Sequence, residues 1–184
     1  MSKLIACVIV LLLPIDNAIC KRMWDYTLLS METTSSDPSK LRIDSAIDRI
    51  NRTASGISAT IHWNYDVDET TFVHLIGHRS NTGNEDDYVL LPWTIPNQTI
   101  AEFSNSYYKP IIHKNMEHCS TLPEKVYPIS KGTVWKFERC VIKGENLPHY
   151  LPDGMYKASF YGIGEVDFSL TVVIKVFKKI DLFG

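Results

Sequence analysis

Apolar and polar residues alternate along most of this chain, a pattern typical of half-buried β-strands. The clearest example is residues 57–65, where Ile57, Ile61 and Trp63 alternate with polar neighbours. Similar alternation predicts strands over residues 23–30, 71–77, 88–93, 155–163 and 166–177. Residues 41–50 fit both a strand and one face of a helix, and we interpret them as a strand. We expect residues 71–77 to pair with residues 57–65, and residues 33–39 to form a polar loop.

Residues 131–157 form the stretch around which we expect the rest of the chain to fold. Trp135, Phe137 and Val141 fall on one face of a strand, with Arg139 as the exception at the same period. The following residues, 146–154, are rich in Pro and Gly and predict turns, because Pro fixes its backbone and cannot donate to a β-ladder. The stretch therefore predicts a strand, a connection and a second strand, arranged like a hairpin.

One amphipathic helix is predicted in the second half of the chain. Thr99 and Glu102 have the spacing of a capping box, in which two side chains satisfy the first free backbone amides. An apolar stripe from residue 100 to residue 112 follows. Pro110 is expected to kink or end the helix. The predicted fold is therefore mainly β, an antiparallel β-cup or sandwich with one short helix.

Composition agrees with a single globular domain. The 184 residues are 45% hydrophobic and 22% charged, and the formal net charge is −2. The absence of a basic stripe argues against binding to nucleic acid through its phosphates. No segment after the first twenty residues is long enough for a membrane helix, so we expect no integral membrane segment.

The first twenty residues have the pattern of a signal peptide. Lys3 precedes an apolar run at residues 4–13, and small residues lie before a cleavage site after Cys20. Cleavage there removes two of the four cysteines and leaves Cys119 and Cys140 as an even pair, whereas earlier cleavage leaves an odd thiol. We therefore predict a signal peptide at residues 1–20, a single secreted domain at 21–184, and a disulfide between Cys119 and Cys140 that ties the helix to the sheet.

The sequence gives little support for catalysis or a metal site. The six histidines include His74 and His78, which a strand would place roughly 13 Å apart, too far for one metal ion. The acidic residues at 81–87 lack the spacing of a calcium loop and predict a solvated turn. Nucleophile elbows and glycine-rich phosphate loops do not occur. We expect a non-enzymatic protein without metal or cofactor.

Aromatic residues gather on or beside the predicted strands and the helix. Five of them are our candidates for the lining of an internal cavity: Trp63, Trp93, Phe103, Trp135 and Phe168. A filled core and the wall of a cavity produce the same sequence pattern, so the alternation itself is compatible with both.

The chain resembles a known family along most of its predicted mature length, from about residue 42 to residue 178. The resemblance lies in WNYDVD, HRSNTGNEDDYVLLPWTIPNQTI and SNSYYKPIIHKNMEHCSTLP, and in Cys140 followed by LPHYLPDGMYK. These motifs are similar to those of the insect chemosensory CheA/CheB family, secreted relatives of the lysosomal ganglioside-activator protein. The resemblance implies an antiparallel β-cup that accepts a lipid or another apolar molecule, with Cys119 and Cys140 paired.

The favoured hypothesis is a secreted carrier of a lipid or hydrophobic small molecule in pheromone or gustatory perception. The alternative is an extracellular module that acts on a sensory receptor, a channel or a lipid-acting enzyme through its surface; a hydrolase with a dispersed active site is least favoured. Sequons at Asn51 and Asn97 are consistent with secretion and predict N-glycans.

Overall fold

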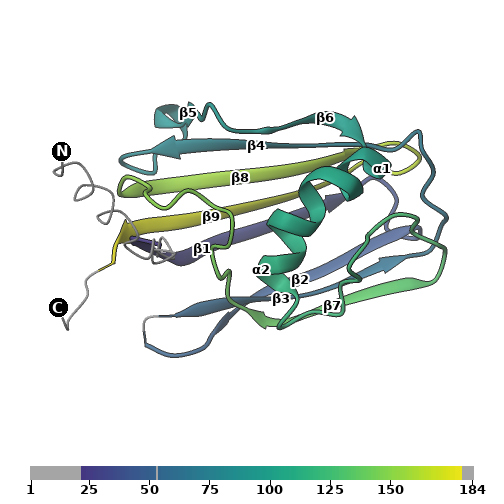
Figure 1. Ribbon diagram of the computed structural model, residues 1–184, viewed down its shortest axis with the longest axis horizontal. Helices are drawn as coiled ribbons and strands as arrows, with labels where there is room; N and C mark the ends of the chain where they lie inside the picture. Colours follow the sequence, from purple (N-terminus) through teal and green to yellow (C-terminus); the bar gives the residue numbers. More distant parts are fainter. Residues whose placement is uncertain (1–21, 53, 180–184) are drawn as a thin grey trace, which may run out of the picture.

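The computed structural model describes residues 22–52 and 54–179, and the predicted signal peptide at residues 1–20 lies outside them. Two antiparallel sheets face each other, with one helix across the space between them (Figure 1). The predicted fold class, mainly β with one helix and one disulfide, is confirmed for these residues.

The larger sheet contains six strands in the order β1-β9-β8-β4-β5, and β6 pairs with the same strand as β5. Its strands are β1 (Trp24–Ser35), β9 (Phe168–Lys178), β8 (Gly154–Ile163), β4 (Phe72–Ser80), β5 (Val89–Leu90) and β6 (Ile95–Thr99). Residues 33–35, predicted as loop, extend β1 because they pair with the start of β9. The strand predicted at 88–93 is shorter than expected, and only Val89–Leu90 is in the ladder.

The smaller sheet contains β2 (Leu41–Arg49), β3 (Ser55–Trp63) and β7 (Thr133–Cys140), in the order β2-β3-β7. The strand interpretation of residues 41–50 is therefore confirmed. Two predicted pairings are wrong, because β4 follows β3 and β8 follows β7 in the chain but both lie in the other sheet. Residues 64–71 and 141–153 cross between the sheets, which connections longer than a hairpin loop allow.

The helical segment runs from residue 100 to residue 116 as α1 (Ile100–Phe103), a π-type stretch η2 (Ser104–His113) and α2 (Lys114–Met116). The capping box of Thr99 and Glu102 is confirmed, with both reciprocal hydrogen bonds present. Pro110 does not end the helix as one alternative predicted. In an α-helix, the ring of a proline clashes with the preceding turn. Pro110 lies in the π-type stretch, where the helix is wider and the spacing between the ring and that turn is different.

The arrangement of edges makes the fold a cup. The two sheets meet along β1 and β2. On the other side, the helical segment begins directly after β6 of the larger sheet and ends near β7 of the smaller one, where Cys119 and Cys140 form the predicted disulfide (Figure 1). The helix and residues 141–153 therefore cross the side on which the sheets are apart.

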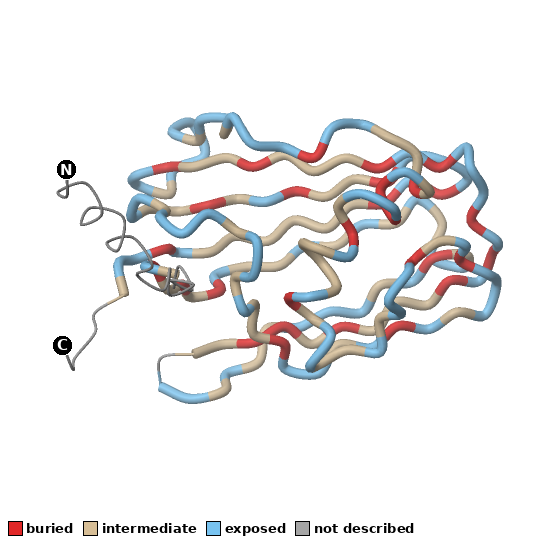
Figure 2. The backbone as a smooth tube through the Cα atoms, viewed as in Figure 1, coloured by how far each residue is buried: buried red, intermediate tan, exposed pale blue. Residues whose placement is uncertain are grey.

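Buried side chains form two separate clusters between the sheets. One contains Trp63, Phe103, Trp135 and Phe168, and the other contains Trp24, Tyr26, Ile57, Tyr156 and Val176. Phe168 and Val176 lie at opposite ends of β9, so the clusters fill opposite ends of the cup. The positions between them are less buried (Figure 2).

Candidate functional site

The middle of β9 is where the interior is incompletely filled. Phe168 is 8% exposed and Val176 is 1% exposed, whereas Leu170, Val172 and Ile174 on the same face are half-buried. An ordinary protein interior is packed as densely as an organic crystal. The partial exposure of three consecutive inward-facing apolar residues therefore indicates a cleft between the two buried clusters.

Ala158 of β8 marks the floor of this cleft. It pairs with Val172 on one side and with Gly77 on the other, so the three residues form one row across the larger sheet. Its neighbours on the same face, Tyr156 and Phe160, belong to or pack against the two clusters, yet Ala158 is exposed. Ala158 is too small to fill its part of this row, whereas Gly77 beside it is buried.

The opposite wall comes from the smaller sheet. Ile43 pairs with Ile61 and packs with it against the first cluster, and both are only partly buried. Phe137 of β7 is also half-buried, and Ser45 of β2, which faces the same way, is exposed. Both sheets thus present apolar side chains to the cleft, with one hydroxyl at the middle of the smaller sheet.

Asn115 fixes the two segments that cross the open side of the cup. Its side chain is buried, and its Nδ2 donates to Ile111 O at 2.7 Å and to Glu145 O at 2.9 Å. Its Oδ1 accepts from the backbone N–H groups of Gly144 at 2.6 Å and Glu145 at 2.9 Å. One amide therefore joins the helix to residues 141–153. The sequence pattern gave no signal for it, because a polar residue near a helix end is ordinarily exposed.

The five aromatic candidates do not share one environment. Trp63, Phe103, Trp135 and Phe168 are buried in the first cluster, where Trp63 makes edge-on contacts with Trp135 at 5.5 Å and Phe168 at 5.6 Å between ring centroids. They form one end of the cleft. Trp93 lies apart from them and is 43% exposed.

Trp93 covers the row of small residues from the edge of the sheet. A Cβ built on Gly77 would lie 3.3 Å from the Trp93 ring and 3.2 Å from Leu91 Cδ1. Since Gly77 shares its row with Ala158, the exposed indole lies at the rim of the cleft. Among the candidates, Trp93 therefore has the environment that best fits contact with a ligand.

Gly77 and Ala158 are the functional candidates that the sequence reasoning missed. The sequence does contain a signal for them, because both are small residues at inward positions of strands that otherwise carry large apolar side chains there. Ala158 lies between Tyr156 and Phe160 at period two, where a large side chain would be expected in a filled core.

Burial raises the pKa values of several tyrosines that close the two ends. The pKa of Tyr65 rises to about 12, mainly by desolvation and in part through the charges of Glu165 and Asp68. Desolvation also raises the pKa of Tyr156, and the nearby Arg79 guanidinium opposes this rise. These hydroxyls are therefore neutral at physiological pH, as an apolar site requires.

The chain matches one family model over residues 64–158, just over half of the sequence, and that family is described as "Protein of unknown function (DUF1091)". The chain belongs to this family. No curated protein matches it. The DUF1091 match includes β4, the helical segment, both paired cysteines and Ala158, so it covers part of the floor of the cleft and the segments that cross its open side, but not β9.

Outside the cleft, the remaining candidates of this DUF1091 protein lie on the surface. Asn51 and Asn97 are both exposed, Asn51 next to the turn before β3 and Asn97 on β6. His74 stacks on Tyr161 with ring centroids 4.9 Å apart, on the outer face of the larger sheet. Within residues 22–52 and 54–179, no three His, Cys, Asp or Glu side chains come together as a metal site, and no helix is long and apolar enough to cross a membrane.

Proposed function

We propose that this protein is a secreted, non-enzymatic carrier of a lipid or another hydrophobic molecule, which it holds in the cleft between its sheets. The observation that carries the proposal is the exposure of Ala158 on the inward face of the larger sheet, between two rows that are buried or half-buried. An apolar molecule there would remove Ala158, Val172 and Ile174 from water.

The expected affinity follows from the area that a ligand covers. Burial of about 500 Å² of apolar surface, counted on both partners, contributes roughly 12 kcal/mol at ~25 cal/mol per Å². Loss of translational and rotational freedom offsets several kcal/mol of this. The net binding free energy, on the order of 8 kcal/mol, corresponds to a dissociation constant in the micromolar range.

The chemosensory part of the proposal has a separate basis. It comes from the resemblance to the insect CheA/CheB family, and the predicted signal peptide, the sequons and the disulfide support an extracellular location. In that setting the carrier would present its ligand to a receptor or channel of a sensory cell.

Direct binding tests the proposal. The mature protein, secreted from insect cells, is titrated with the neutral fluorescent probe N-phenyl-1-naphthylamine, which is then displaced by a panel of alkanes, alcohols, esters and lipids. Native mass spectrometry before and after organic extraction checks for a ligand acquired during secretion. Saturable displacement by at least one class supports the proposal, and absence of probe binding together with an unladen mass overturns it.

The surface of β5 favours a second candidate function. Val89 is 69% exposed and Leu90 is 59% exposed, and this edge strand pairs with β4 only. An exposed apolar edge strand is a common docking site for another chain. A protein that binds no apolar molecule but is crosslinked through β5 to a receptor or channel would act through this surface instead.

A further inference from the structure

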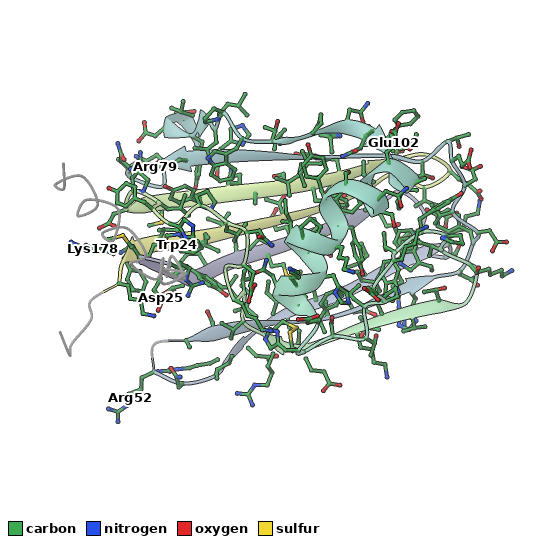
Figure 3. All side chains as sticks on the ribbon, viewed as in Figure 1. Trp24, Asp25, Arg52, Arg79, Glu102 and Lys178 are labelled. Carbon is green, nitrogen blue, oxygen red and sulfur yellow. A yellow bond between two sulfur atoms is a disulfide. The ribbon has the colours of Figure 1, made fainter. Side chains whose placement is uncertain are left out.

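Arg79 lies at the end of the cleft floor that adjoins the second cluster. In the register of the larger sheet it pairs with Tyr156 of β8, one row beyond Gly77 and Ala158. Opposite residues of an antiparallel pair share a face, so Arg79 is on the inward side with Tyr156. It is the only charged side chain among the inward positions of β4 and β8, both of which the structure describes completely. Figure 3 places Arg79 at the same end of the larger sheet as Trp24, which lies on β1 at the other edge.

The charge of Arg79 has no counter-ion in the described part of the chain. Its Nη2 donates to Asp153 O at 2.6 Å, and its guanidinium carbon lies 6.0 Å from the centroid of the Tyr156 ring. Its Nε is buried and has no hydrogen-bond acceptor. A guanidinium ordinarily pairs with a carboxylate or phosphate when it is partly buried, since desolvation of an unpaired charge is unfavourable.

Apolar side chains lie beside Tyr156, the partner of Arg79 in the sheet. Leu91 and Leu151 pack against the cluster that contains Tyr156, and Ala158 opens the next row of the sheet. A cation with a free donor at the end of an apolar cleft matches a molecule with an apolar chain and an anionic head.

We propose that the cleft selects single-chain amphiphiles with a carboxylate head, that the chain lies over Ala158, and that Arg79 binds the carboxylate. This inference rests on the proposed function, because it specifies the ligand class of the same cleft. The Nη1 group of Arg79, which makes no hydrogen bond within the described residues, is the donor proposed for the carboxylate, while Nη2 continues to bind Asp153 O.

The test compares two probes that differ only in the head group. Dodecanoate and dodecan-1-ol displace the neutral naphthylamine probe at neutral pH, below the micelle-forming concentration of either. We expect the wild-type protein to bind dodecanoate about tenfold more tightly than the alcohol, as for one charge-assisted hydrogen bond. Dodecyl phosphate is a third probe, and tighter binding of the phosphate than of dodecanoate would overturn the assignment to carboxylates.

Three variants then locate the preference. Arg79→Met is expected to bind dodecanoate and dodecan-1-ol equally, with the affinity that the wild-type protein has for the alcohol. Arg79→Lys is expected to keep part of the preference for dodecanoate because it keeps the charge. Arg42→Met is the matched control, since Arg42 is exposed on β2 and pairs with Asp44 away from the cleft. Melting temperatures confirm that each variant is folded.

The outcomes separate this inference from the proposed function. Equal affinity of the wild-type protein for dodecanoate and dodecan-1-ol overturns the role of Arg79 and leaves the carrier function standing. Arg79→Met could instead lose affinity for both probes equally and still prefer dodecanoate. That result would show that Arg79 only supports Asp153 and the adjoining loop, and it would also overturn the role of Arg79 in binding the carboxylate. Failure of both probes and of the whole panel overturns the carrier function itself.

Discussion

The indole ring of Trp93 lies directly over Gly77, at 3.3 Å from the position that a Cβ on Gly77 would occupy. The other three tryptophans, Trp24, Trp63 and Trp135, are at most 8% exposed, so Trp93 is the tryptophan that solvent reaches. A ligand over the adjoining Ala158 would cover this ring. The contact between an exposed aromatic ring and a glycine at the cleft rim therefore provides an intrinsic reporter of occupancy.

We expect acrylamide to quench mainly the fluorescence of Trp93, and a bound apolar ligand to reduce this quenching. Trp93→Phe should remove most of the quenchable emission and the effect of the ligand. Trp135→Phe is the control, because Trp135 is buried in the first cluster and its loss should leave the quenchable fraction in place. If the ligand reduced acrylamide quenching in Trp93→Phe as much as in the wild-type protein, the ligand would bind elsewhere.

The disulfide is expected to contribute substantially to stability. Cys119 and Cys140 are 21 residues apart, and closing a loop of that length stabilises a fold by about 3 kcal/mol in the chain-entropy model. Replacing both cysteines with serine should lower the free energy of unfolding in urea by about this amount. Either single variant should lose at least as much, because it also leaves a free thiol. A loss below about 1 kcal/mol in the double variant would mean that the helix end is held by other contacts.

Asn115→Ala should loosen the two segments that cross the open side of the cup. The change removes four hydrogen bonds of a buried amide and leaves the backbone groups of Gly144 and Glu145 without partners, at a cost of roughly 2–4 kcal/mol. Hydrogen exchange at the amides of Gly144 and Glu145 should become faster. Asn105→Ala is the control, because Asn105 is exposed on the same helical segment. Unchanged exchange at Gly144 would contradict the assigned role of Asn115.

Removal of two buried tyrosine hydroxyls should have different effects on the free energy of unfolding. The Tyr108 hydroxyl donates to Pro123 O at 2.6 Å, whereas the Tyr65 hydroxyl is buried without a hydrogen-bond partner. Tyr108→Phe should therefore lower the free energy of unfolding by about 1 kcal/mol. Tyr65→Phe should leave it unchanged or raise it slightly, since no buried polar group loses a partner. Equal losses in urea unfolding would show that Tyr65 has an unrecognised partner.

The raised pKa of Tyr65 also predicts how stability depends on alkaline pH. Below about pH 10 the hydroxyl is neutral in both the folded and the unfolded chain, so it has no effect. Between pH 10 and its folded pKa of about 12, only the unfolded chain releases the proton, and the free energy of unfolding falls as pH rises. Tyr65→Phe should make this fall shallower in urea titrations above about pH 10. An unchanged slope would contradict the assigned cause.

The sequence predicted the local features of the fold and missed several of its long-range ones. Alternation identified the buried faces of most strands, and the spacing of Thr99 and Glu102 identified the helix start, because both depend on neighbouring residues. The pairing of β3 with β4 was wrong, since a period of two fixes which face is buried but does not identify the partner strand. The helix does not end at Pro110, which was one of the two predicted alternatives, because a π-type stretch accommodates the proline and depends on more than local sequence.

The candidate site was only partly predictable for a related reason. Trp63, Trp135 and Phe168 were recognised as interior residues, but their pattern is the same whether they fill a core or border a cleft. What distinguishes the two is the small, exposed side chain of Ala158, which becomes adjacent to Gly77 and to Trp93 above it only through the register of β4 and β8. Arg79 is placed beside them by the same register.

Filling the cleft is the most direct test of the account. Ala158→Phe adds a large apolar side chain on the inward face, and Ala46→Phe adds the same side chain to an exposed alanine of β2 that faces away from the cleft. Both variants should fold, because neither alanine is packed. In probe-displacement titrations, we predict that Ala158→Phe loses at least about tenfold in affinity for every apolar ligand that the wild-type protein binds, while Ala46→Phe retains wild-type affinity. Unchanged binding in Ala158→Phe, or an equal loss in both variants, would contradict a ligand site between the sheets.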